Sequence, residues 1–379
     1  MQPGSASTEF VSRIGQALEG AGRRGIHVTA GAGSQDLEAH FLRNAAGDEQ
    51  RSEGGPKHLE TPPGQRDPGA PDGSSRLCYF LDGVQSTREI GRVGPVPIIA
   101  TTVAAAIINR CDRRFSRMPF EVPPAVVRAV ILPLGVDERV DTLHDLLLAE
   151  GLGTLAHEQA MEAPDLVLNS GEYAPITDPA DYVGMKAIAY GRARTLRERL
   201  EGEMLRQWEG DDRTLADSEA WIAVDGQLRN IRENNRRAIG LIKSVARPEF
   251  RDEDVGMLLD LKPGMRTTSF VPGWQTGLSP NEQRTSWYLR TWPVQRGADA
   301  LGSLMRIEAQ RDMPPETVDE ISRWVLAERA PLAKPDPRWP AMIYPIHYVE
   351  KVLKPIVQGA ERAYTKLERQ LAGTTNGRN

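Results

Sequence analysis

Two apolar segments, far apart in the chain, are each followed by an Asp-Gly pair. Residues 77–81 precede Asp82-Gly83, and residues 221–224 precede Asp225-Gly226. Both segments have the composition of a buried strand. A single Asp-Gly pair is most simply the turn of a β-hairpin. Two Asp-Gly pairs, each at the end of a buried strand, indicate instead that the two acids lie at the edge of a sheet, where α/β proteins bind ligands. Two carboxylates held in this way could bind divalent metal ions through oxygen.

Strand-like and helix-like segments alternate along the rest of the chain. Further strands are predicted over residues 96–108, 126–134, 239–242, 286–292 and 303–309. Helices are predicted over residues 7–19, 136–161, 180–208, 315–329 and 346–371. The polar residues 84–94 could form a hairpin arm after the first Asp-Gly pair. This mixture predicts an α/β (mixed) fold, with a core sheet flanked by helices.

Composition divides the 379 residues into unequal parts. Residues 44–76 contain few apolar side chains and many Gly, Pro and charged residues, which predicts a flexible insertion or linker. Residues 1–43 form an N-terminal helical extension, with a second short helix at residues 37–42. The main domain covers residues 77–371, and residues 372–379 are expected to be a disordered tail.

Charge and cysteine content exclude several classes of protein. With 47 basic and 52 acidic residues, the net charge is -5. That value argues against a protein whose whole surface is basic and binds nucleic acid, but not against a local basic groove. Two cysteines make neither a disulfide framework nor a zinc site, so a reducing, cytoplasmic setting fits best. The longest apolar stretch, residues 95–108, is shorter than the ~20 residues of a membrane span, so no membrane association is expected.

Other common motifs are incomplete or absent. Residues 20–25 match GxGxxG, but no strand precedes them and no helix follows, as a dinucleotide site would require. His157-Glu158 begins like HExxH and lacks the second histidine of a zinc site. No GxxxxGK[ST] sequence occurs, so the chain should not hydrolyse ATP by itself.

The helix before Asp225 offers a third carboxylate. Its apolar face consists of residues at helical spacing, namely Ala193, Leu196, Leu200, Met204 and Trp208. Arg197 and Glu201 lie at the edge of that face, and Glu198 lies farther round as the alternative third acid. An inward-facing Glu201 needs a partner, which could be a metal ion or Arg197 one turn away. Glu201 could have both partners at once, because an arginine can orient a carboxylate that binds a metal ion.

Basic residues accumulate after the second Asp-Gly pair. Residues 226–251 contain seven basic residues and two acidic ones. Such an excess is typical of a phosphate-tracking surface, although it is also found on plainly solvated helices. The candidates for nucleic-acid contact are Arg229, Arg232, Arg236, Arg237 and Arg247. Lys243 directly follows the predicted strand 239–242, where it could steady an attacked phosphate or be a simple charge at the strand end.

The order of these features resembles the NurA nuclease family. The shared order is strand-Asp-Gly, a helix with Arg and Glu, strand-Asp-Gly-x-Leu, strand-Lys, a late Arg-x-Glu strand, and Tyr-Pro opening the last helix. Each motif is short, so the order carries the resemblance, which spans about residues 77–370. The matching segments are Tyr79–Gly83, Arg197–Glu201, Val224–Leu228, Gly240–Ser244, Met305–Glu308 and Tyr344-Pro345.

The resemblance implies a ribonuclease-H-like core and a divalent-metal-dependent DNA nuclease. Nucleases of this family typically prefer Mn²⁺ over Mg²⁺ and have 5′-to-3′ exonuclease and endonuclease activities. The resemblance also implies a homodimer that docks on a hexameric HerA-type ATPase. DNA end processing in repair and anti-phage defence are both compatible with it.

The family's functional residues can be carried over position by position. The metal-binding acids would be Asp82, Glu201 and Asp225. Lys243 would lie near the scissile phosphate, and Tyr344 would be the family's late tyrosine. The family's late histidine has no counterpart in residues 350–353, whereas His347 lies closer to Tyr344.

Two other functions are compatible with the sequence. The absence of the family's late histidine is also compatible with a nuclease-like scaffold that clamps DNA or regulates a partner ATPase without cutting. Stabilisation by metal on heating would distinguish a nuclease from such a scaffold. A small-molecule phosphoesterase would use the same acids, but it would leave the basic stretch unexplained.

Overall fold

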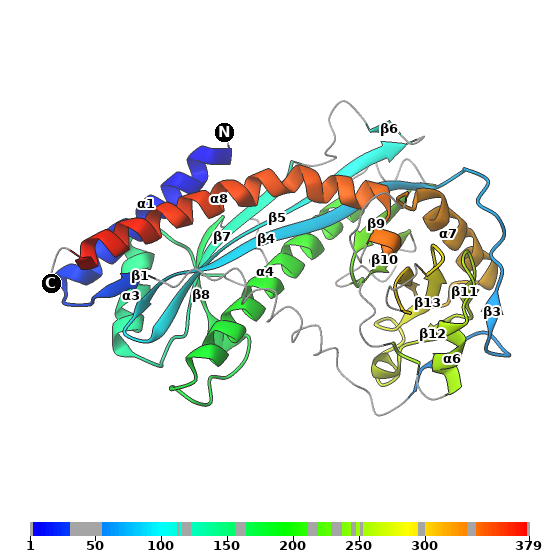
Figure 1. Ribbon diagram of the computed structural model, residues 1–379, viewed down its shortest axis with the longest axis horizontal. Coiled ribbons are helices and arrows are strands. Elements are labelled where there is room, and N and C mark those ends of the chain that lie inside the picture. The colour runs from blue at the N-terminus through cyan, green and yellow to red at the C-terminus, as the bar shows by residue number, and fades with distance from the viewer. Residues whose placement is uncertain are drawn as a thin grey trace.

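The computed structural model describes residues 3–30, 55–111, 114–115, 123–155, 164–210, 219–228, 237–243, 248–250, 253–294, 300–331 and 339–376. Its strands form one mixed sheet (Figure 1). The main path through the sheet is β2 (Lys57–His58), β12 (Phe270–Val271), β13 (Arg284–Arg290), β14 (Leu304–Gln310), β10 (Ala238–Ile242), β9 (Trp221–Asp225), β4 (Leu77–Val93), β5 (Val96–Cys111), β7 (Ala125–Leu132) and β8 (Asp165–Asn169). The pairs β4–β9, β9–β10 and β7–β8 are parallel, and the other pairs on this path are antiparallel.

Helices cover both faces of this sheet. The long helices are α1 (Pro3–Arg23), α3 (Glu138–Ala149), α4 (Tyr182–Gly210), α7 (Pro315–Glu328) and α8 (Tyr344–Asn376). One face, where Phe80 and Ala223 are buried, packs against α7 and the first half of α8. The other face, where Leu81 and Val224 are buried, packs against α4. A third apolar core joins α1, α3 and the second half of α8 at the far end of the sheet. The prediction of a mixed α/β fold with N-terminal and C-terminal helices is confirmed.

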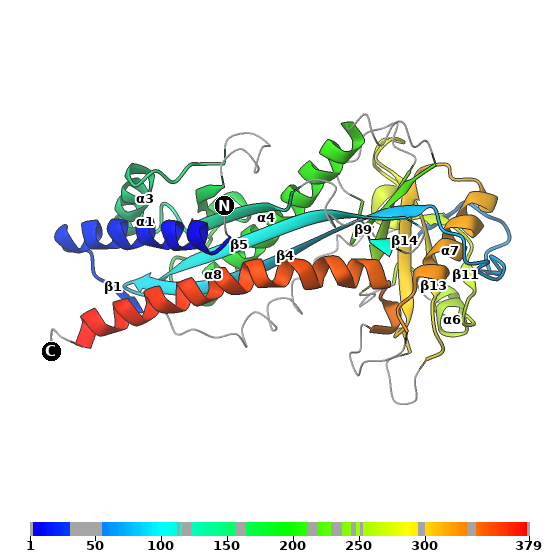
Figure 2. The ribbon, with the colours of Figure 1, turned by 90° about the horizontal axis from the view of Figure 1, so that it is seen from above.

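The strands β4 and β5 form a ribbon much longer than the sequence predicted. They pair along most of their length and turn at Gly94, whose φ of 57° suits glycine. Figures 1 and 2 show this ribbon joining the two ends of the molecule, with α8 lying along it. The predicted strand end at Asp82 is therefore wrong, because Asp82 and Gly83 lie inside β4. The expected hairpin arm, residues 84–94, is the continuation of that strand, stabilised by burial of Ile90 in the third core.

Other predicted elements differ mainly at their ends. The helix predicted over residues 136–161 ends at Ala149, and residues 156–163 lie outside the described ranges. The predicted tail is helical as far as Asn376. Residues 31–54, with the predicted short helix and the first part of the predicted linker, also lie outside the described ranges. Short or polar elements not predicted include β1 (Val28–Ala30), β3 (Gln65–Arg66), β6 (Arg114–Phe115), β8, α6 (Glu253–Leu259) and β11 (Arg266–Thr267). Within the described part of the chain, every helix is too short or too polar to cross a membrane.

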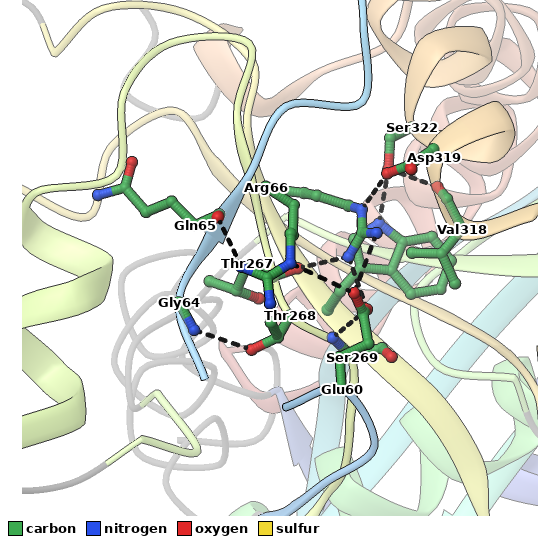
Figure 3. A network of polar contacts seen from close by, with 12 residues as sticks. Glu60, Gly64, Gln65, Arg66, Thr267, Thr268, Ser269, Val318, Asp319 and Ser322 are labelled. Atoms are coloured by element: carbon green, nitrogen blue, oxygen red, sulfur yellow. Dashed lines mark hydrogen bonds and ion pairs between the residues drawn. The ribbon is translucent and has the colours of Figure 1, made fainter. Parts of the chain in front are cut away.

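Residues 55–76, expected to be a flexible linker, form an ordered strap across β11 and β12. The strands β2 and β3 pair with β12 and β11. Glu60 accepts hydrogen bonds from Arg266 Nη1 at 2.7 Å and from the Ser269 N–H at 2.8 Å. Arg266 Nε also donates to Asp319 of α7, and Figure 3 shows this network. Burial raises the pKa of Glu60, but the hydrogen bonds outweigh it and hold the pKa below its ordinary value. Ionic contacts thus order a segment that has little apolar surface.

Candidate functional site

Asp82 and Asp225 lie side by side on neighbouring parallel strands. The register pairs Leu81 of β4 with Val224 of β9, so the two acids that follow are adjacent. Because Leu81 and Val224 are buried against α4, strand alternation directs both acids to the opposite face, toward α7 and α8. Asp82 is only 5% exposed. Its Oδ1 accepts a hydrogen bond from the Gly83 N–H at 2.8 Å.

The pKa of Asp82 is raised well above its ordinary value. Burial is the largest cause, and repulsion from Asp225 and, more weakly, from Glu201 adds to it. The positive charges of Lys243 and Arg197 oppose the shift without cancelling it. The surroundings of Asp82 are therefore short of positive charge, a condition that a bound cation relieves.

Lys243 contacts Asp225 from the end of β10. Its Nζ lies 2.7 Å from Asp225 Oδ2 and 3.5 Å from the Sδ of Met342, which lies just before α8. Burial lowers the pKa of Lys243, but the charges of Asp225 and Asp82 outweigh it and raise the pKa above its ordinary value. Lys243 consequently keeps its proton at neutral pH and supplies a positive charge beside the acids.

Glu201 approaches the same part of the sheet from α4, on the other face. Its carboxylate fills the space where Gly83 has no side chain: a Cβ there would overlap Glu201 Oε1 and lie 3.0 Å from Cγ and Cδ. Gly83 thus makes room for Glu201 and does not form a turn. The predicted ion pair is present, with Arg197 Nε 3.4 Å from Glu201 Oε1. Burial lowers the pKa of Arg197, but Glu201, followed by the two aspartates, outweighs it and raises the pKa.

An open pocket lies between α4 and the end of β9. It encloses ≈ 450 Å³, its open mouth included, and its polar lining consists of Arg197, Glu198, Glu201, Asp225 and Gln227. Gly226 has a φ of 104°, a left-handed conformation that suits glycine, and it turns the chain away from β9 as predicted. A Cβ on Gly240 of β10 would lie 2.6 Å from Gly226 O, so that glycine leaves room for the turn.

The alternative third acid, Glu198, has a different partner. Its Oε1 lies 3.4 Å from Arg194 Nε, one turn away on α4. Glu198 and Glu201 both line the pocket. Glu201 lies against Gly83, beside Asp82, and its charge acts on Asp82, so the geometry favours Glu201 as the third acid.

The donor set suits a hard divalent cation, but the three acids are not gathered around one point. Carboxylate oxygens are ligands that Mg²⁺ and Mn²⁺ prefer, and the shortage of positive charge at Asp82 fits such an ion. Within the ranges that the structure describes, no three His, Cys, Asp or Glu side chains are placed to hold a metal together. Lys243 engages Asp225, and Arg197 engages Glu201. A metal ion would have to compete with these two cations.

The structure describes two of the other predicted site residues. Tyr344 is the first residue of α8, two positions after Met342, and is 45% exposed. Arg237 directly precedes β10 and is half-buried. The other predicted nucleic-acid contacts lie outside the described residues and stay predictions: Arg229, Arg232, Arg236 and Arg247.

Sequence reasoning missed Glu350 as part of this site. The negative charge of Glu350, on α8, is the smallest of the causes that raise the pKa of Lys243. Glu350 Oε2 lies 3.8 Å from His347 Nδ1, and its Oε1 lies 3.0 Å from Lys354 Nζ. The helical spacing of these three residues is visible in the sequence. Only the packing of α8 shows that Glu350 lies near Lys243.

Comparison with solved structures gives a distant likeness, whereas comparison of the sequence gives none. Neither a protein-family model nor a curated protein matches the sequence. The structure is similar to the crystal structure of the NurA nuclease from Sulfolobus solfataricus, with a TM-score of 0.36 and 12% identity. The likeness covers 79% of this chain and 86% of that chain. A likeness this distant does not assign an activity.

Proposed function

We propose that this protein is a divalent-metal-dependent DNA nuclease. The observation that carries the proposal is the proximity of Asp82, Asp225 and Glu201, with Lys243 and Arg197 beside them and an open pocket that Glu201 and Asp225 line. Burying like charges together costs folding free energy, so clusters of this kind are typical of functional sites. Acids on two central strands and one helix, with a protonated lysine beside them, suit the hydrolysis of a phosphodiester.

Each residue of the cluster has a role in this proposal. The acids that would hold Mn²⁺ or Mg²⁺ are Asp82, Glu201 and Asp225. The bound metal would supply positive charge that activates water and stabilises charge developing on the phosphate. Lys243 would exchange its hydrogen bond to Asp225 for one to a non-bridging phosphate oxygen. Arg197 would hold the Glu201 carboxylate in its orientation.

The biological setting belongs to the same proposal. The activities would be a 5′-to-3′ exonuclease, an endonuclease, or both. The chain would act as a homodimer with a HerA-type hexameric ATPase, in the cytoplasm, in DNA end processing or anti-phage defence. Support for these points comes from the order of sequence motifs, together with the lack of a phosphate-binding loop for ATP.

Cleavage of end-labelled linear and closed circular DNA tests the proposal. We expect cleavage with Mn²⁺ or Mg²⁺, none with EDTA, and none by Asp82→Asn, because an amide keeps the shape of the carboxylate but loses metal affinity. Asp145→Asn is the matched control, since that side chain is 77% exposed. Unimpaired cleavage by Asp82→Asn would refute the assignment. If the purified chain is inactive, the assay is repeated with the partner ATPase, and continued inactivity would refute the nuclease function.

A second candidate is a nuclease-like scaffold that binds DNA or regulates the ATPase without cutting. The observation that favours it is the pairing of Asp225 with Lys243 and of Glu201 with Arg197, which engages oxygens that a metal would need. Thermal unfolding with Mn²⁺ separates the two functions. A nuclease site should be stabilised by about 2.7 kcal/mol at a metal concentration near 100 times Kd, whereas a scaffold should show no shift.

A further inference from the structure

The outer surface of α8 carries four basic residues in one row. Lys351, Arg362, Lys366 and Arg369, here called the α8 stripe, are all exposed. At 3.6 residues per turn they fall within an arc of about 60° and extend over about 27 Å of helix. The opposite side of α8 is apolar and buried, with Leu353 and Tyr364 in two of the cores. The stripe therefore faces solvent along more than half of the helix.

The acids of α8 do not neutralise this row. Over residues 344–372, whose side chains are described, every exposed charged residue is basic. Glu368 is buried and receives hydrogen bonds from Arg88. Glu350 pairs with Lys354, and Glu361 is partly buried. In a chain of net charge -5, this helix presents a local surface of one sign.

Stability of the helix does not explain the stripe. The last turn of α8 contains no basic residue, so the stripe does not serve to compensate the helix dipole there. Arg362 and Lys366 are four residues apart, and like charges at that spacing cost about 0.2–0.5 kcal/mol. None of the four stripe residues has a hydrogen bond or ion pair among the contacts described for the chain. A row of like charges that lowers the stability of the helix, and that has no described partner within the chain, indicates an external anion as its partner.

The position of α8 links the stripe to the acid site. The helix begins two residues after Met342, whose sulfur contacts Lys243. From there α8 runs along the β4–β5 ribbon to the far end of the molecule (Figures 1 and 2). An extended polyanion lying on the stripe would thus have one end directed at the acids.

We propose that the α8 stripe binds the sugar-phosphate backbone of DNA and leads the strand to the acid site. The proposal rests on the proposed nuclease function for its second part, but binding to the stripe is independent of cleavage. In duplex DNA the phosphates of one strand are spaced about 3.4 Å along the helix axis, so the length of the stripe spans several of them. An anionic membrane is a weaker fit, because the only exposed large apolar side chain described on α8 is Tyr344 and surface helices insert apolar residues.

Binding is measured first, with EDTA present so that cleavage cannot interfere. The probe is a fluorescently labelled single strand or duplex, and the test protein is the full chain with all four stripe residues changed to Gln. Loss of four phosphate contacts should lower the slope of log K against log salt by about 3. Between about 50 and 200 mM salt, the wild type should then lose on the order of 100-fold more affinity than the variant.

A charge-matched comparison shows whether position matters. Arg362→Gln/Lys366→Gln removes two charges from the stripe, and Lys57→Gln/Lys262→Gln removes two exposed charges near the strap, at the other end of the molecule. We expect a reduced salt slope for the first pair only. Equal effects of the two pairs, or none from the fourfold variant, would overturn the stripe as a DNA site. Loss of binding to phosphatidylserine vesicles with DNA binding intact would assign it to a membrane and also overturn the proposal.

Cleavage separates this proposal from the nuclease function. With Mn²⁺, the fourfold variant should cut long DNA at least tenfold more slowly but hydrolyse bis(4-nitrophenyl) phosphate, which is too small to reach the stripe, at the wild-type rate. A wild type that binds DNA through the stripe but cleaves neither substrate would refute the nuclease and leave the stripe as a DNA site. A variant that cuts long DNA like the wild type would refute the path from the stripe to the acids.

Discussion

Gly83→Ala tests the geometry of the acid site without changing any charged residue. The added Cβ would lie roughly 1 Å closer to Glu201 Oε1 than two such atoms can approach. The backbone of Gly83 is held by its pairing with Ala105 of β5, so the flexible end of Glu201 must move instead. A 1 Å misplacement of a catalytic group can cost about 100-fold in rate. Stability should change by less than about 1 kcal/mol, because alanine is tolerated in a strand and Gly83 has no left-handed φ.

The assay compares metal-dependent DNA cleavage with thermal unfolding for Gly83→Ala. Gly15→Ala in α1 is the control, because nothing lies within 4 Å of a Cβ at that position. Glu201→Asp in the Gly83→Ala background shortens the acid by one methylene and should restore part of the activity. Full cleavage by Gly83→Ala with unchanged stability would refute the role given to the Gly83–Glu201 contact. Unfolding of the variant would show instead that the glycine serves the strand.

Three further substitutions test other contacts. Lys243→Met should destabilise the protein by about 1–3 kcal/mol, because the half-buried Asp225 loses its charged hydrogen-bond partner, and should abolish cleavage; urea unfolding and the cleavage assay measure both. Tyr364→Phe removes the hydrogen bond of the buried hydroxyl with Thr102 and should cost about 1 kcal/mol with cleavage unchanged. Glu60→Gln should cost about 1–2 kcal/mol at pH 7. Because the pKa of Glu60 is held below 4.5, this stability is present above pH 4.5 and lost as the pH falls through the folded value, so urea unfolding near pH 3 should show little difference.

Local sequence patterns were sufficient to predict the mixed fold and to point to the candidate acids. Apolar runs such as residues 221–224 and the amphipathic face of α4 specify strand and helix through side-chain periodicity alone. The ion pair between Arg197 and Glu201 also follows from helical spacing. These features depend on neighbours in the chain, which the sequence shows directly.

Long-range packing decided the rest. Asp82-Gly83 has the composition of a turn, yet both residues pair with Ala106 and Ala105 of β5, which keeps them inside a strand. The predicted linker is ordered because Glu60 meets Arg266, more than two hundred residues away in the chain. Glu350 reaches the neighbourhood of Lys243 only through the course of α8. The sequence by itself determined which groups the chain contains and their local structure. The tertiary structure alone decided which of those groups meet, because burial and charge act between residues close in space.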